Sequence, residues 1–384
     1  MFWKYLLFET KLLMHNRKNW LLGIALILFF PLYYLHYSQT DLEDLLKKKN
    51  LDSQQFHTIF NAFPTELRHT PEGEGIYNNL TQQIMMIDMQ RFYLWQKKHY
   101  DKFIENGLKL NELRLELHEL GNKGIHPNHI IPKDEIQRES ALLRYYQEND
   151  LPLIPNPLAA SNYLPVTLRL LSGLLFCLLV LVAGSSMLVK DQVHRSVVSG
   201  FPVSFMQKVC SKVAIHFVQI MLFLFTGISA GVYYVAKKSE IGNFTAPVLI
   251  YQDGDFFAVS TTRYIIYMLI AFALITLLLL LAFALINVVT KNLYASAFIL
   301  LVILLLPDLM RVAEVQVNWL YPLKFIDIGY VLNGDAALEF GNKKLDFKNS
   351  YIWLISMNVI VASALYFGNK LVHMRKVEGL LKTS

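Results

Sequence analysis

The residues best suited to bind a partner lie between positions 190 and 212, in the sequence KDQVHRSVVSGFPVSFMQKVCSK. This segment separates two apolar stretches and carries four basic residues and one acid: Lys190, Arg195, Lys208, Lys212 and Asp191. Gly200 and Pro202 interrupt any helix within it. Basic loops between membrane segments stay on the cytoplasmic side. We therefore interpret the segment as a docking surface for a cytosolic partner.

The sequence lacks the signatures of common catalytic sites. It contains no G-x-x-x-x-G-K-[ST] phosphate loop, no H-E-x-x-H metalloprotease pair and no G-x-S-x-G elbow. His126 and His129 are three residues apart, but no cysteine or acid cluster accompanies them at the spacing of metal ligands. We expect neither an enzyme nor a metal site in this chain.

The elements that would position the docking segment are membrane helices. Of the 384 residues 54% are hydrophobic and only 17% are charged, which is rare in soluble domains. The apolar stretches are long enough to cross a bilayer. They predict six spans, at 20–37, 164–189, 213–236, 264–290, 293–312 and 351–369. The fourth and fifth spans form one long apolar run that is too long for a single crossing, so we divide it at the polar Thr290-Lys291-Asn292.

The distribution of charge predicts the orientation. Residues 38–163 carry 14 Lys/Arg and 18 Asp/Glu, a net charge of −4; because the whole chain carries +6, the remainder carries +10. The excess of Lys and Arg beside the spans places both termini in the cytoplasm. This basic balance is explained by topology and by contact with anionic lipid, so we expect no nucleic-acid partner.

Acidic residues within the spans bear on energy coupling. Carriers driven by protons or sodium ions usually keep titratable or liganding groups at mid-depth. Here the one acid in a span is Asp308, near the outer end of the fifth. The lack of an acidic residue at the centre of the spans favours an apolar or amphipathic cargo and an energy source outside the membrane part.

The soluble segments complete the expected fold, an all-α membrane protein with an N-terminal interfacial helix and a helical extracellular domain. Residues 2–18 are amphipathic in helical register, with Trp3, Lys4, Lys11 and Lys18 as candidate contacts to the membrane surface. The helical pattern at 75–120 ends at Gly121 and Gly124, and a second helix is expected from Lys133 to Glu148. The aromatic segment NWLYPLKFIDIGYVLNG suggests an interfacial or re-entrant piece, although an aromatic belt without a role in transport is an equal alternative.

These expectations divide the chain as follows. The segments are an interfacial helix (1–19), the first span (20–37), an extracellular helical domain (38–163), the second span (164–189), a cytoplasmic loop (190–212), the third span (213–236), an outer loop (237–263), the fourth and fifth spans (264–290 and 293–312), an outer interfacial or re-entrant segment (313–350), the sixth span (351–369) and a cytoplasmic tail (370–384).

This layout resembles the permease subunits of type-2 ABC exporters. The resemblance rests on the amphipathic entry helix, the six spans and the loop between spans two and three. In that family the loop runs acid, several residues, Gly, then Pro-hydrophobic-Ser, then Lys. Here the corresponding residues are Asp191, Gly200, Pro202, Val203, Ser204 and Lys208. Two departures are the Asp where Glu is commoner and the large helical domain between spans one and two, which only some branches have.

The resemblance implies specific partners and roles. Two ABC ATPase subunits would bind ATP and Mg, whereas this chain would bind no cofactor; a second permease copy or a sister permease and membrane lipid complete the partners. Asp191 and Arg195 would make polar contacts with the ATPase. Phe201, Val203 and Phe205 would form an apolar plug.

We therefore predict the permease subunit of an ATP-driven exporter in a bacterial plasma membrane. Its cargo would be hydrophobic or amphipathic, such as an antimicrobial peptide or a lipid-like compound. The alternative is a non-transport immunity or sensor protein that acts through the extracellular helical domain. The two differ in whether the loop at 190–208 is required.

Overall fold

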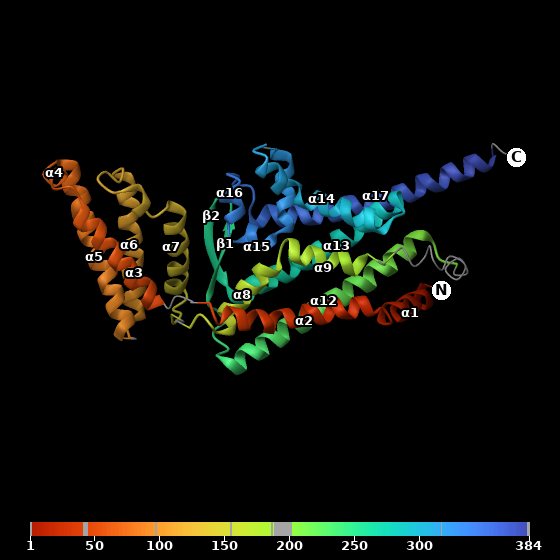
Figure 1. The fold of residues 1–384 in the computed structure, drawn as a ribbon, viewed down its shortest axis with the longest axis horizontal. Coiled ribbons are helices and arrows are strands. Elements are labelled where there is room, and N and C mark those ends of the chain that lie inside the picture. Colours follow the sequence, from red (N-terminus) through yellow and green to blue (C-terminus); the bar gives the residue numbers. More distant parts are fainter. Residues whose placement is uncertain are drawn as a thin grey trace. The chain divides into compact units, whose positions relative to one another are not determined.

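The computed structural model describes residues 2–40, 45–96, 98–153, 156–185, 187, 202–315 and 317–381 (Figure 1). The chain forms two compact units. The first, which we call the span unit, comprises Met1–Leu35, Val166–Lys238 and Ile265–Ser384. The second, which we call the bundle unit, comprises His36–Pro165 and Ser239–Tyr264.

The span unit contains the helices expected of a multi-pass membrane protein. Within the described residues, five helices are long and apolar enough to cross a bilayer, and a bent pair raises this number to six. The five are α2 (Arg17–Tyr37), α12 (Phe205–Lys238), α13 (Thr261–Thr290), α14 (Leu293–Val312) and α17 (Phe347–Leu381). Apolar side chains such as Leu32, Leu222 and Phe298 are exposed on these helices, as expected where helices contact lipid.

The break between α13 and α14 falls at the polar residues that separate the two predicted spans. Lys291 adopts a left-handed backbone conformation with φ of 52°. The Asn292 side chain then accepts hydrogen bonds from the backbone N–H groups of Tyr294 and Ala295. This is an ordinary N-cap, and it explains why the apolar run divides here.

The second predicted span, 164–189, is not one straight helix. It consists of α8 (Ala160–Leu171) and α9 (Leu174–Gly184), whose axes are bent by 62°. The helix breaks at Ser172-Gly173, where Gly173 has φ of 75° and ψ of −140°. Only glycine adopts this conformation without substantial strain.

The bundle unit is mainly helical. It contains α3 (Leu45–Ala62), α4 (Thr65–Arg68), α5 (Pro71–Gln96), α6 (Tyr100–Glu119) and α7 (Lys133–Glu148). The helices α5 and α6 form an antiparallel pair, in which Asn79 of α5 donates to the Leu113 carbonyl and Gln90 donates to the Phe103 carbonyl. Phe56, Ile76, Leu80 and Leu110 lie in its apolar core.

A β-hairpin lies within residues 237–263, for which the sequence predicts an outer loop without regular structure being specified. Strand β1 (Pro247–Gln252) pairs antiparallel with β2 (Asp255–Ser260), from Pro247 opposite Ser260 to Gln252 opposite Asp255. Asp253 and Gly254 have φ of 53° and 97°, so they form the two-residue turn that Asp-Gly favours. The hairpin packs on α7, where the Arg138 guanidinium lies 4.8 Å from the Phe256 ring centroid.

The remaining elements of the span unit are short. Helix α1 (Phe2–Met14) precedes α2, and the segment between α14 and α17 forms the 3-10 helix η2 (Asn318–Ile326), α15 (Ile328–Leu332) and α16 (Asp335–Glu339). Leu320, Phe325 and Ile328 of this segment are buried. It is therefore a packed part of the span unit rather than a simple connection.

Candidate functional site

The described part of the predicted docking segment begins at Pro202. Asp191, Arg195, Gly200 and Phe201 lie outside the described residues. Pro202 and Ser204 are exposed, whereas Val203, Phe205 and Lys208 are half-buried. Apolar side chains thus remain accessible at the start of α12.

The first turn of α12 is fixed by a reciprocal pair of hydrogen bonds. The Gln207 backbone N–H donates to Ser204 Oγ over 3.3 Å, and the Ser204 backbone N–H donates to Gln207 Oε1 over 2.9 Å. This arrangement is the capping box of an S-x-x-Q sequence. It satisfies backbone donors that would otherwise lack partners, so the helix starts at a defined residue.

One turn further along, α12 makes a buried ion pair with α1. Lys212 Nζ lies 3.2 Å from Glu9 Oε1, and the two side chains are only 3% and 9% exposed. Tyr5 donates its hydroxyl hydrogen to the same oxygen over 2.6 Å, while Lys212 also donates to the Met187 carbonyl over 2.9 Å. The pair joins α1 to the helix that the docking segment enters.

The surface residues predicted for the interfacial helix divide between two helices. Trp3, Lys4 and Lys11 are exposed on α1, with Trp3 73% exposed. Lys18 belongs instead to α2, because α1 ends at Met14. Its Nζ donates to the Val182 carbonyl and to Ser185 Oγ, each over 2.7 Å, and so joins α2 to the end of α9.

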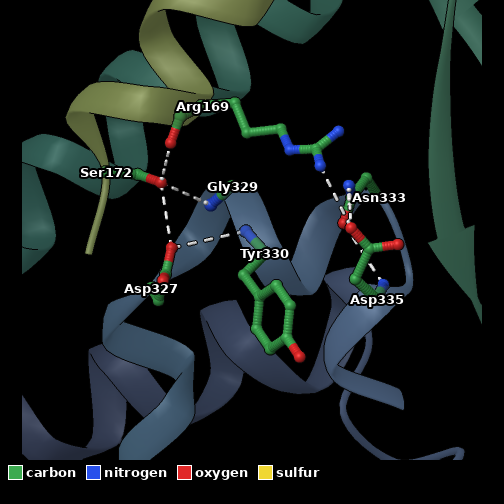
Figure 2. Close-up of polar contacts among 7 residues, drawn as sticks. All are labelled: Arg169, Ser172, Asp327, Gly329, Tyr330, Asn333 and Asp335. Atoms are coloured by element: carbon green, nitrogen blue, oxygen red, sulfur yellow. Dashed lines mark hydrogen bonds and ion pairs between the residues drawn. The ribbon is translucent and has the colours of Figure 1, made fainter. Parts of the chain in front are cut away.

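A second polar cluster holds the break between α8 and α9 (Figure 2). Ser172 Oγ lies 3.0 Å from Asp327 Oδ1 and 2.6 Å from the Arg169 carbonyl, and it accepts a hydrogen bond from the Gly329 N–H over 3.2 Å. Asp327 Oδ1 also accepts from the Tyr330 N–H over 3.4 Å. The start of α15 is therefore bound to the break.

The contact at the break is too close for side chains larger than glycine. A Cβ at Gly173 would lie 2.6 Å from Asp327 Oδ2, and one at Gly329 would lie 2.5 Å from Ser172 Oγ. Burial raises the pKa of Asp327, although the Ser172 hydrogen bond and the charge of Lys324 oppose this effect. The carboxyl group thus takes up a proton more readily than an exposed aspartate does.

A neighbouring ion pair holds α8 to the same segment. Arg169 Nη2 lies 3.1 Å from Asp335 Oδ2, which also accepts from Asn333 Nδ2 over 2.7 Å. Figure 2 shows Arg169 reaching along the segment toward Asn333 and Asp335. Two separate attachments therefore set the angle at the broken helix, and neither was apparent from sequence spacing.

Neither cluster has the composition of a metal centre. Among the residues that the structure describes, no three His, Cys, Asp or Glu side chains are grouped to hold a metal ion. The rings of His126 and His129 pack edge-to-face with centroids 5.9 Å apart. What the two clusters can do is position helices: one at the start of α12 and one at the α8–α9 break.

No protein-family model, curated protein or solved structure matches this chain.

Proposed function

We propose that this chain is the membrane-spanning permease subunit of an ATP-driven exporter. The observation that carries the proposal is the start of α12: accessible Pro202 and Val203 precede, and half-buried Phe205 begins, a capped helix that is long enough to cross a bilayer. A partner that displaces this end would move a transmembrane helix directly. The basic segment at 190–212 supplies the charge for such a partner.

In this proposal a separate ABC ATPase, present in two copies, binds ATP and Mg and docks on residues 190–208. A second permease copy or a sister permease completes the membrane part, in a bacterial plasma membrane with both chain termini in the cytoplasm. Nucleotide-driven closure of the ATPase pair shifts the permease between inward and outward states. The cargo is hydrophobic or amphipathic.

The test is a pull-down of the tagged chain in mild detergent, with ATP hydrolysis assayed on the eluate. We expect an ATPase to co-elute with the wild-type chain and to be lost with Phe201→Glu or Phe205→Glu. Phe257→Glu is the matched control, because Phe257 is 49% exposed on the β-hairpin and should not affect docking. An ATPase-free chain that still confers its cellular phenotype would contradict the exporter.

A second candidate, a non-transport immunity or sensor protein, is favoured by one surface of the bundle unit. Met85, Met89, Phe92 and Trp95 of α5 are 54%, 41%, 46% and 71% exposed. They follow helical spacing along one face, and methionine-rich and aromatic surfaces of this kind bind varied apolar partners. Replacing Met89 and Phe92 by serine should abolish the phenotype of a sensor, whereas an exporter should keep both its phenotype and its co-eluting ATPase.

A further inference from the structure

A pocket of about 260 Å³ lies at the end of α14, entirely within the span unit. The last turns of α14 contribute Pro307, Met310 and Arg311, which are spaced to lie on one helix face, and Glu314 follows just beyond the C-cap residue Ala313. The other walls come from the connection to η2, from η2 itself and from the end of α16: Val315, Val317, Leu320, Tyr321, Glu339 and Phe340.

Most of the wall is apolar or aromatic. Met310, Val315 and Leu320 are aliphatic, and the rings of Tyr321 and Phe340 pack with centroids 5.2 Å apart. Such a surface accommodates an apolar body, with a few polar groups to orient it.

The charges in the wall favour a cation. Arg311 is paired with Glu339, and nearby Lys324 is paired with Asp308. Within the described residues, the Glu314 carboxylate has no ion-pair partner. One arginine against two glutamates gives the lining a net charge of −1. The carboxyl end of α14 adds a partial negative charge from the helix dipole.

Glu314 also adopts a left-handed backbone conformation that glycine favours. The Glu314 N–H donates to the Arg311 carbonyl and the Val315 N–H donates to the Met310 carbonyl, each over 2.9 Å. These bonds define a Schellman motif, in which Glu314 takes the left-handed position with φ of 58°. Non-glycine residues held in such conformations are concentrated at functional sites.

We propose that this pocket binds a cationic amphiphile, with an amine at Glu314 and an apolar body against Met310, Leu320 and Phe340. The same chemistry is presented by a free amine-bearing compound and by the amino headgroup of a lipid. The proposal goes beyond the exporter and does not rest on it, because binding is a property of this chain without any ATPase.

The test uses the full chain in phosphatidylcholine nanodiscs and dansylcadaverine, a primary amine on a fluorescent apolar ring system. We expect saturable binding with a blue-shifted emission, and about threefold weaker binding in Glu314→Gln because one exposed charge pair is lost. Glu119→Gln, an exposed carboxylate of the bundle unit, is the matched control and should bind like the wild-type chain.

Two further variants separate loss of the site from loss of the fold. Glu314→Gly removes the side chain and relieves the left-handed backbone, so it should unfold no more easily than the wild-type chain and yet bind weakly. Glu314→Lys should reverse the charge preference of the pocket, so this variant should bind the anionic dansylaminoundecanoic acid more tightly than the cationic dansylcadaverine. Absence of saturable binding by the wild-type chain, or equal affinity in Glu314→Gln, would overturn the proposal.

The source of the amine is distinguished by lipid composition. Displacement of dansylcadaverine when phosphatidylethanolamine replaces phosphatidylcholine identifies the lipid headgroup as an occupant. Unchanged binding in both lipids, with the Glu314 dependence intact, identifies a free amphiphile. Either result supports the site, whereas displacement that is equal in Glu314→Gln and the wild-type chain would show lipid competition elsewhere and contradict it.

Discussion

The ion pair between Glu9 and Lys212 holds the start of α12 against α1. Both side chains are almost fully buried. Replacing Lys212 by methionine should lower the free energy of unfolding by about 3–5 kcal/mol, because Glu9 would remain charged without its partner. Denaturant unfolding in mild detergent measures this loss.

The double variant is the control. Glu9→Leu combined with Lys212→Met removes both charges, so it should recover most of the lost stability. A double variant that is as unstable as Lys212→Met would show that the lysine acts through its bond to the Met187 carbonyl instead.

Replacement of Gly173 tests the polar cluster at the break between α8 and α9. Gly173→Ala should destabilise the chain by about 1–3 kcal/mol, because alanine strains the backbone and its Cβ collides with Asp327. Gly75→Ala is the matched control: Gly75 lies in α5 with no atom near its missing Cβ, so the change should be neutral or stabilising. Equal thermal unfolding of both variants would contradict the role of Gly173.

Some of these residues carry a local signal and others do not. Ser204 and Gln207 form an S-x-x-Q pattern, and a capping box of this kind can be recognised from four consecutive residues. The Glu9–Lys212 and Ser172–Asp327 contacts join residues 203 and 155 positions apart. No spacing rule identifies such pairs, because they depend on how helices pack.

At the scale of elements, the start of α12 depends on its cap. Ser204→Ala should destabilise the first turn by about 0.5–2 kcal/mol and speed hydrogen exchange at residues 205–208, because the backbone donors lose the Ser204 oxygen. Gln207→Glu should keep slow exchange, since a carboxylate accepts the same bond and suits the helix N-terminus. Unchanged exchange in Ser204→Ala would contradict the cap.

Three helices of the bundle unit meet at Glu139 of α7. Its carboxylate lies 2.9 Å from Lys49 Nζ of α3 and 3.0 Å from Arg114 Nη1 of α6. Burial alone would raise the pKa of Glu139, but the charges of Lys49 and Arg114 and the Lys49 hydrogen bond outweigh it and lower the pKa to about 2.

This pKa predicts acid sensitivity. A carboxyl group whose pKa is lower in the folded state stabilises the fold above its unfolded pKa, and this stabilisation is lost as the pH falls toward 2. We therefore expect thermal stability of the wild-type chain to fall between about pH 4.5 and 2. Glu139→Gln should show a smaller fall by circular dichroism; an equal fall in both proteins would place the acid sensitivity elsewhere.

The helical elements were predictable because their apolar runs and end signals are local. Lys133–Glu148 of α7 and the break at Lys291-Asn292 have such signals, whereas the bend at Gly173 shows only one glycine within an apolar run. The β-hairpin was missed even though Asp253-Gly254 is a turn signal between β-prone residues. Its strands are short, and their packing on α7 supplies stability that the segment lacks alone.

At the scale of the whole molecule, the chain's two cysteines report its orientation. Cys210 is exposed near the start of α12, whereas Cys177 is buried in α9. Because the predicted topology places the start of α12 in the cytoplasm, a membrane-impermeant maleimide should leave wild-type cells unlabelled and label Cys210 after permeabilisation. Cys210→Ser should remove this labelling.

The opposite side is tested with Asp255→Cys in the exposed part of the β-hairpin. This variant should be labelled in intact cells, because the predicted topology places residues 237–263 outside. Labelling of Cys210 in intact cells would place the start of α12 outside and exclude docking by a cytosolic ATPase.

The length of α12 has a mechanical consequence. Its 34 residues correspond to roughly 50 Å of helix, whereas the apolar core of a bilayer is about 30 Å thick. Roughly 20 Å of the same helix therefore extends past the apolar core. In the proposed exporter such a helix would act as a rigid rod that pivots in the membrane: a small sideways push at Phe205 would tilt the opposite end in the reverse direction, without refolding any turn between them.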